Sequence, residues 1–192
     1  MDNRSDAVIE MMRRELYMPV IHIDTNLINS RGKVEAMNRL ERWAQDGLIA
    51  MNISDTGLSE ALAGNGAQRT RKALAQIYTI NNTYPDTSDP IYQKIESALF
   101  PGGAKTQNQR NDVAIVREAA KWNAILVTRD GGSKSQPGGM LGNREKIRDY
   151  VRIMTAGEAV AFVKNKINER DEFNLRIARE YGGELPEWTG KD

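Results

Sequence analysis

The sequence contains no cysteine and a single histidine among its 192 residues. The lack of cysteine excludes disulfides, thiolate metal sites and cysteine nucleophiles, and it is compatible with a reducing cytoplasm. A lone histidine excludes, within one chain, the paired-imidazole chemistry of metal-free ribonucleases. It is His22, in an apolar stretch with no serine elbow nearby, so a Ser–His–Asp site is not indicated either. Carboxylate chemistry is the remaining expectation.

The sequence also lacks a long apolar run and an excess of charge of either sign. Charged residues interrupt positions 1–16 every few residues, so we expect no signal peptide. No apolar run approaches the roughly 18 residues that span a bilayer. We therefore expect a soluble, cytoplasmic protein without membrane contact. Because the formal net charge is only +1, binding to nucleic acid must rest on local basic patches, or on cations that reverse the charge of an acidic site.

Hydrophobic periodicity predicts that short strands alternate with helices. Strands are predicted at 20–23, 48–53, 124–128 and 151–154. Helices are predicted at 6–17, 33–46, 54–62, around 73–78, at 91–99, at 111–122 and from Thr155 to about Tyr181. This alternation is typical of an α/β protein, a three-layer α/β/α sandwich with a central, mainly parallel sheet of four to five strands.

The chain is expected to divide into residues 1–165, a domain that includes the N-terminal helix, and residues 166–192, a C-terminal helix and tail. The end of the tail, GGELPEWTGKD, is predicted to be loose. Trp43 and Trp122 fall on helical stripes, where packing is the expected role, whereas Trp188 in the tail has no readable role.

Acidic residues follow the predicted strands. Asp24 follows the first strand and Asp130 the third, and ligands of parallel sheets bind beyond the carboxyl ends of strands. Either residue alone is ordinarily a turn-forming aspartate. Two acids at one end of a sheet are a stronger signal, because like charges placed close together are costly unless a proton or cation intervenes. Asp55 follows the second strand, where capping of a helix is the expected role.

Periodicity alone does not select two further acids. Glu60 lies near the first turns of a predicted helix, where a solvated charge or half of a capping box is the ordinary interpretation. Asp112 is predicted in the first turn of its helix, a position that favours carboxylates through the free N–H groups and the dipole.

Together the four acids resemble the pattern of PIN-domain nucleases. VIHIDTNLI resembles the first PIN motif, SEAL carries the helical glutamate, and NDVAIVREAAKWNAILVTRD resembles the third and fourth motifs in one block. VRIMTAGEAVAFV resembles the last strand and helix of the family. The resemblance covers roughly residues 18–165 in the correct order. An N-terminal helix, an insertion around 80–109, the glycine-rich loop 131–143 and a C-terminal helix are additions, which leave the subclass open.

The resemblance implies a metal-dependent nuclease that uses Mg²⁺ or Mn²⁺, with RNA favoured over DNA. The implied metal ligands, directly or through water, are Asp24, Glu60, Asp112 and Asp130. It also implies that Thr128 orients a carboxylate or a metal-bound water. Asn26 is expected to hold Asp24 in place, and Arg129 and Lys134 are candidates for contact with substrate phosphate. Hard cations of this kind prefer oxygen ligands and need only a few carboxylates.

Several alternatives stay open within this interpretation. A toxin of the toxin–antitoxin type (VapC-like) would imply a small protein partner that covers the acidic cleft, and PIN domains often form homodimers. Another magnesium-dependent phosphoryl hydrolase would need an aspartyl nucleophile, often in an Asp-x-Asp motif after the first strand, and a lysine after a later strand. Asp24 precedes Thr25-Asn26, which argues against the phosphatase pattern. A catalytically inactive PIN-fold binding module is disfavoured because all four acids are present. The loop 131–143 lacks the P-loop spacing and is a candidate flap over the site.

Overall fold

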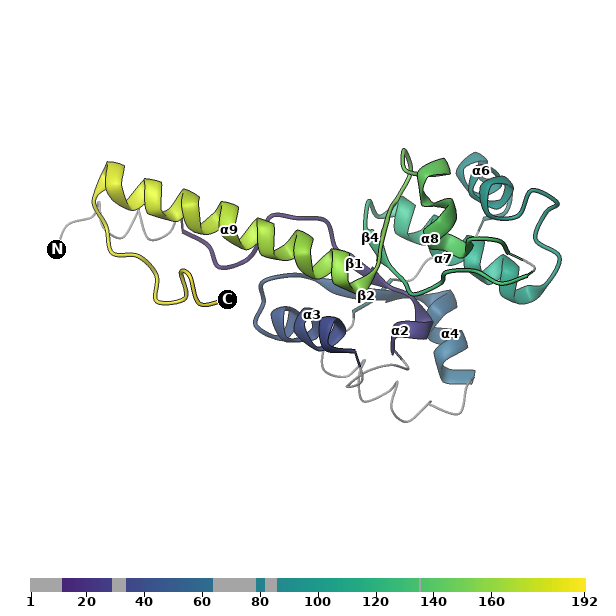
Figure 1. Cartoon of the computed structure of the whole chain (residues 1–192), viewed down its shortest axis with the longest axis horizontal. Helices are drawn as coiled ribbons and strands as arrows, with labels where there is room; N and C mark the ends of the chain where they lie inside the picture. The colour runs from purple at the N-terminus through teal and green to yellow at the C-terminus, as the bar shows by residue number, and fades with distance from the viewer. Residues whose placement is uncertain (1–11, 29–33, 64–78, 82–85, 135) are drawn as a thin grey trace.

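The computed structural model describes residues 12–28, 34–63, 79–81, 86–134 and 136–192, with residues 79–81 described by their backbone alone (Figure 1). The strands are β1 (Ile21–Ile23), β2 (Met51–Ser54), β3 (Thr79–Asn81), β4 (Ile125–Val127) and β5 (Arg152–Met154). The helices are α2 (Thr25–Ile28), α3 (Glu35–Gln45), α4 (Asp55–Ala63), α6 (Pro90–Leu99), α7 (Gln107–Lys121), α8 (Gly139–Asn143), the short 3₁₀ helix η1 (Arg144–Lys146) and α9 (Ala156–Tyr181).

The five strands form one parallel sheet in the order β3-β2-β1-β4-β5. Helices flank both faces of the sheet, so the fold is α/β with three layers, as the alternation of strands and helices predicts (Figure 1). The chain builds outward from β1 through β2 to β3 and then crosses back to β4 on the other side of β1. The strand order therefore reverses between β1 and β4, which is where open α/β sheets form their ligand crevice.

Two apolar cores lie on the two faces of the sheet, because side chains alternate along each strand. Ile21 and Ile23 point into the core formed with α3 and α9, which contains Met37, Leu40 and Val163. The other face packs against α7, and α6 packs on α7 in turn. The core on this face includes Leu126, Ile153, Ile95, Val113 and Val116. Both cores are fully buried and fix the strand ends that carry the acidic residues.

The four predicted strands are confirmed as β1, β2, β4 and β5, each shorter than predicted. The strand β3 was not predicted, because Thr79-Ile80-Asn81 is short, two-thirds polar and next to a turn-rich segment. Its pairing with β2 makes it an edge strand. The helix predicted around 73–78 lies outside the described residues.

Local sequence signals explain most helix ends. Gly47, at φ 73°, adopts the left-handed conformation just after α3, as expected for a glycine that ends a helix. Thr106 caps α7 and Thr155 caps α9, each in a capping box with the residue three positions on. α9 runs without interruption from Ala156 to Tyr181, so the expected domain boundary at residue 165 falls inside it.

The helix predicted at 6–17 is wrong for residues 12–17, which have no helical structure, and its remainder lies outside the described residues. The apolar residues of this segment are buried from a non-helical backbone instead of from one face of a helix. Leu16 donates its backbone N–H to the carbonyl of Leu48 at 2.9 Å. Its side chain lies in the core formed with α3 and α9, which we call the main core. Met12 packs against Ile177 of α9.

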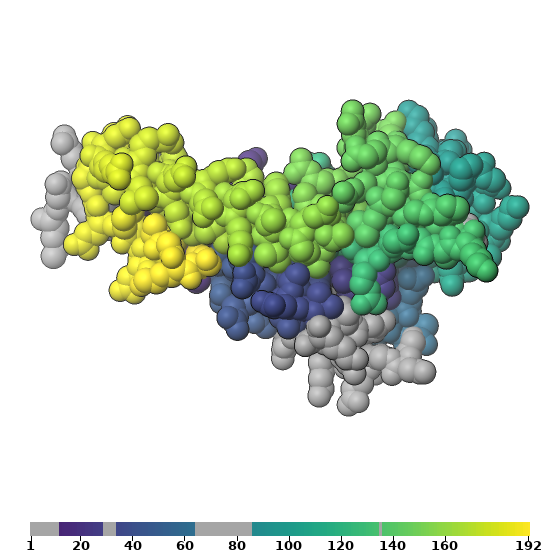
Figure 2. Space-filling view, viewed as in Figure 1, coloured from purple at the N-terminus to yellow at the C-terminus, as the bar shows by residue number. Residues whose placement is uncertain are grey.

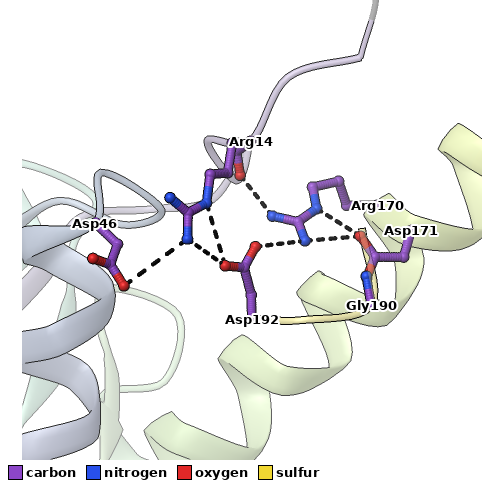
Figure 3. Close-up of polar contacts among 6 residues, drawn as sticks. All are labelled: Arg14, Asp46, Arg170, Asp171, Gly190 and Asp192. Atoms are coloured by element: carbon purple, nitrogen blue, oxygen red, sulfur yellow. Dashed lines mark hydrogen bonds and ion pairs between the residues drawn. The ribbon is translucent and has the colours of Figure 1, made fainter. Parts of the chain in front are cut away.

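The prediction that the tail is loose is also wrong. The Asp192 carboxylate accepts hydrogen bonds from Arg14 at 2.6 Å and from Arg170 at 2.9 Å, and its side chain is only 4% exposed (Figure 3). The Arg170 guanidinium also lies 4.4 Å from the centre of the Trp188 ring. We call Arg14, Arg170 and Asp192 the clasp, because they join the N-terminal segment, α9 and the tail.

The remaining predictions on single aromatic and helical features have mixed outcomes. Trp43 is buried in the main core as predicted, but Trp122 is 50% exposed at the end of α7, so the packing prediction for it is wrong. His22 is a buried residue of β1, as predicted. In the part of the chain that the structure describes, no helix combines the length and apolar character needed to cross a membrane.

Candidate active site

The candidate site lies at the carboxyl ends of β1 and β4, on either side of the point where the strand order reverses. Asp24 follows β1 directly, and its backbone N–H donates to the carbonyl of Val127 in β4 at 3.0 Å. Thr128 and Asp130 follow β4. Parallel pairing of these two central strands therefore brings the acids that come after them to one edge of the sheet.

Asp24 is buried, with an exposed fraction of 5%, and is held by two side chains. Its Oδ2 accepts a hydrogen bond from the Thr128 hydroxyl at 2.5 Å and another from the Asn26 amide at 2.7 Å. The pKa of Asp24 is raised to about 6, mainly by burial and also by the charges of Glu60 and Asp130, while the hydrogen bond from Thr128 opposes the rise. Thr128 and Asn26 thus contact Asp24 as expected.

Glu60 reaches the same edge from α4, the helix that starts where β2 ends. Its Oε1 accepts a 2.6 Å hydrogen bond from the Asn111 amide of α7, and its Oε2 lies 3.2 Å from the Thr25 hydroxyl. The Thr25 hydroxyl also lies 3.1 Å from the carbonyl of Gly57, and its single hydrogen serves one of the two acceptors at a time. Glu60 is therefore a contact point between α2, α4 and α7, not a solvated helix charge.

Asp112 does not open its helix as predicted. α7 begins at Gln107, five residues earlier, because Thr106 and Gln109 form the capping box. Asp112 consequently lies in the second turn, where capping no longer explains a carboxylate. Its pKa is raised to about 7, mainly by burial and also by the charges of Asp130, Asp24 and Glu60. Within the described residues its carboxylate has no hydrogen-bond partner.

Asp130 is half-buried and is held by the loop that follows it. Its Oδ1 accepts from the backbone N–H of Gly132 at 3.0 Å and its Oδ2 from that of Met140 at 2.8 Å. The Asp130 N–H in turn donates to the Thr128 hydroxyl at 3.0 Å. Thr128 therefore joins Asp24 and Asp130 through one hydroxyl. Asp130 therefore does stabilise a turn, as its ordinary role would predict. Each of its carboxylate oxygens can still accept a second hydrogen bond or bind a cation through its other lone pair.

The loop 131–143 folds around Asp130 and ends in the short helix α8, so it is not an open connection. Gly139, at φ 55°, lies so close to Asp130 that a Cβ there would be 2.6 Å from both carboxylate oxygens. Gly132, at φ 99°, is equally confined against the backbone of Gly138 and Gly139. Glycine is required at both positions for the backbone to approach the carboxylate.

The two residues predicted to contact substrate phosphate, Arg129 and Lys134, lie on either side of Asp130 in the sequence. Arg129 and Lys134 are exposed, and neither has a hydrogen bond or ion pair within the described residues. Asp55, the fifth acid considered, begins α4, while the hydroxyl of Ser54 caps that helix by accepting from the Gly57 N–H at 3.0 Å. Burial lowers the pKa of His22 to about 4, so this residue is a neutral strand residue near neutral pH.

Sequence reasoning missed three polar residues that contact or border the site. Thr25 and Asn111 both contact Glu60, and each directly follows or precedes one of the predicted acids, which is the only signal that could have found them. Glu118 of α7 is completely buried at the start of α4, 3.4 Å from the Thr56 hydroxyl. Burial raises the pKa of Glu118 to about 7. The sequence signal that could have identified Glu118 is its position as a charged residue within the apolar stripe of a helix.

The donor set fits a hard divalent cation, since all four acids offer carboxylate oxygens and two of them have raised pKa values. Within the described residues, however, no three His, Cys, Asp or Glu side chains stand in a ready metal-holding arrangement. Metal binding would therefore require side chains of the site to draw together. Asp112, which lacks a hydrogen-bond partner there, is the acid least restrained from moving.

Comparison of the chain with models of known protein families found no match, and comparison with curated proteins also found none.

The raised pKa of Asp112 predicts a pH-dependent stability. Its pKa is higher in the folded chain than the ordinary 3.8, so the unfolded carboxyl ionises first as the pH rises. Folding stability is therefore lost progressively between pH 3.8 and about 7. In EDTA, Asp112→Asn should be more stable than wild type by about 1–2 kcal/mol above this range, with no gain below it. Urea unfolding across this pH range measures the difference, and Asp149→Asn on the exposed surface is the control. A gain that is equal at all pH values would contradict the raised pKa of Asp112.

The close approach of Gly139 to Asp130 predicts a position-specific cost of alanine. Gly139→Ala should lower the free energy of unfolding by about 1–3 kcal/mol, because it combines a left-handed backbone with a clash against the carboxylate. Gly142→Ala is the matched control, since it lies in the same helix and a Cβ there has nothing within 4 Å. Thermal and urea unfolding of both variants decides. Equal stability of the two would mean that the loop does not enclose Asp130.

Proposed function

We propose that this chain is a divalent-metal-dependent nuclease of the PIN type, which hydrolyses phosphodiester bonds. The observation that carries the proposal is the electrostatic coupling of four acids at the strand-order reversal. Asp24 and Asp112 both have raised pKa values, for which burial is the largest cause and the charges of Glu60 and Asp130 a further one. Carboxylates that repel one another in this way are characteristic of a site built for a cation.

The proposed cofactor is Mg²⁺ or Mn²⁺, held by Asp24, Glu60, Asp112 and Asp130 directly or through water. When bound, such an ion activates water and neutralises the charge that develops on the phosphate. The absence of cysteine and the burial of the one histidine leave oxygen ligands as the available donors.

The chain's own residues restrain three of the four acids before any ion binds. Thr128 and Asn26 orient Asp24, Asn111 orients Glu60, and the backbone N–H groups of the loop orient Asp130. Fixing ligands in this way lowers the cost of bringing them together around a cation. Asp112 is the fourth acid and is expected to complete the set by moving toward the other three.

The substrate assignment rests on other grounds. RNA is favoured over DNA because PIN domains resemble this sequence, and Arg129 and Lys134 are proposed to contact substrate phosphates since both are exposed and unpaired within the described residues. An antitoxin-like protein that covers the acidic edge and a homodimer are proposed partners on the same resemblance.

One observation favours a second candidate, a PIN-fold binding module without activity. Among the described residues no three acids are already arranged around a common metal position. If that arrangement persists in the presence of metal, the chain would bind nucleic acid without cleaving it. Another magnesium-dependent phosphoryl hydrolase is the third alternative, and cleavage of a small phosphate ester with no cleavage of nucleic acid would indicate it.

The nuclease proposal predicts metal-dependent cleavage that depends on Thr128. Labelled single-stranded RNA and DNA are incubated with wild type, Asp112→Asn, Thr128→Val and Thr128→Ser in Mn²⁺, Mg²⁺ or EDTA. We expect cleavage only with metal, none with Asp112→Asn, and a loss of about 10–100-fold with Thr128→Val. Thr128→Ser keeps the hydroxyl that Asp24 and Asp130 share, so it should retain most activity.

Each result of that assay has a distinct meaning. Cleavage that persists in EDTA or in Asp112→Asn would contradict the assignment of the acids. Binding of Mn²⁺ without cleavage of either polymer would support the binding module. Equal losses in Thr128→Val and Thr128→Ser would show that the hydroxyl does not orient the carboxylates.

A further inference from the structure

A basic groove lies between α3, α9 and the tail, on the opposite face of the sheet from α7. Its cations are Arg14, Arg39, Arg42, Lys164 and Lys191. Figure 2 shows the end of the tail (yellow) beside α9, where it reaches the surface of the α3 region (blue). Segments distant in sequence thus contribute positive charge to one concave surface, in a chain whose net charge is only +1.

The acids of the groove do not cancel this charge. Asp192 is bound by Arg14 and Arg170, so its carboxylate is already neutralised within the clasp. Asp46 lies 4.0 Å from Arg14, and Glu35 lies 4.0 Å from Arg39. By contrast, Arg42, Lys164 and Lys191 have neither a hydrogen bond nor an ion pair from their side chains in the described ranges. The five cations that line the groove exceed its three acids by two, so the surface keeps a net positive charge.

The clasp is what brings Lys191 into the groove. Asp192 and the Gly190 N–H, the latter donating to Asp171 at 2.9 Å, fix the residues on both sides of Lys191 against α9 (Figure 3). Without these contacts the tail would not line the groove, and Lys191 would not contribute its charge to it. The ion pairs of the clasp thus have a consequence beyond stability, because they hold a cation opposite Arg42 and Lys164.

The two helices that wall the groove both start at the acidic edge of the sheet. α9 begins at Ala156, one residue after its cap Thr155 and just beyond the end of β5, and extends back along the sheet. α3 precedes the start of β2 and, as the crossover between parallel strands, also runs back from the carboxyl edge. The two helices therefore run side by side in the same direction, away from the end of the sheet that carries the acids (Figure 1).

We propose that this groove binds the phosphodiester backbone of a nucleic-acid strand that extends beyond the acidic site. The proposal rests on the proposed nuclease function and assigns the path of its substrate. Lysine and arginine bind phosphates largely by releasing condensed counterions, which suits a groove of unpaired cations. The acidic site itself offers few cations for this task, so a second, basic surface supplies the affinity.

The test is a binding measurement in EDTA, where no cleavage interferes. Fluorescence anisotropy compares wild type with the triple variant Arg42→Gln/Lys164→Gln/Lys191→Gln on long single-stranded RNA and DNA over a range of salt concentrations. The control variant Arg148→Gln/Arg176→Gln/Arg179→Gln removes three exposed cations elsewhere and changes the net charge equally. Thermal unfolding confirms that both variants are folded.

We expect the groove variant to bind about 10–100-fold more weakly at low salt, and the slope of log affinity against log salt to fall by about 2, while the control stays near wild type. Losses on both polymers would indicate backbone recognition, and a loss on one alone would name that polymer as the ligand. Equal weakening in the groove and control variants, or no weakening in either, would overturn the proposal.

Cleavage of a short oligonucleotide separates this proposal from the nuclease proposal. If the chain is a nuclease and the groove holds only the distal strand, the groove variant cleaves the short substrate like wild type and the long one more slowly. If wild type cleaves neither but the groove variant still loses affinity, the nuclease proposal fails and the groove stands. If the groove variant cleaves the long substrate at the wild-type rate and affinity, the groove alone fails.

Discussion

Asp24 occupies the position on which the rest of this fold depends. It is buried at the end of the central strand β1, where burial and neighbouring charges oppose its ionisation. A buried carboxylate is tolerated only if hydrogen bonds or an opposite charge compensate it. Thr128 and Asn26 supply the hydrogen bonds, and the parallel pairing of β1 with β4 brings Thr128 within reach. No cationic side chain of the described residues bonds to Asp24. The proposed metal ion would supply the opposite charge at this position.

The other elements position the remaining three acids around Asp24. α4 and α7 meet at Glu60 through Asn111, and the same helix α7 carries Asp112 to the sheet edge. The glycine-rich loop encloses Asp130, which fixes the fourth acid through backbone groups. On the opposite face, α3, α9 and the tail form a surface of positive charge. The molecule thus separates an acidic edge from a basic groove, which would let one strand of a polyanion contact both.

The sequence predicted the layers, four strands and the places of Asp24 and Asp130 at the strand ends, because buried strands and turn chemistry are local signals. Glu60 and Asp112 were selected only by the resemblance to PIN domains. The sequence did not predict that Asp112 lies in the second turn, since Thr106 and Gln109 form a capping box upstream that was overlooked. Nor could it predict Asn111 against Glu60, or Asp192 against Arg14 and Arg170, because these contacts join residues far apart in sequence. Short edge strands such as β3 depend on pairing with a neighbour rather than on their own residues.

The most direct measurement is anomalous diffraction from crystals of the protein grown with Mn²⁺. We expect an anomalous peak at the carboxyl ends of β1 and β4, with oxygen ligands from Asp24 and at least two of Glu60, Asp112 and Asp130, and with Asp112 moved toward the other acids. A site without a peak at a Mn²⁺ concentration that saturates binding in solution, or a peak held by other residues, would contradict the claim that these four carboxylates form a metal centre.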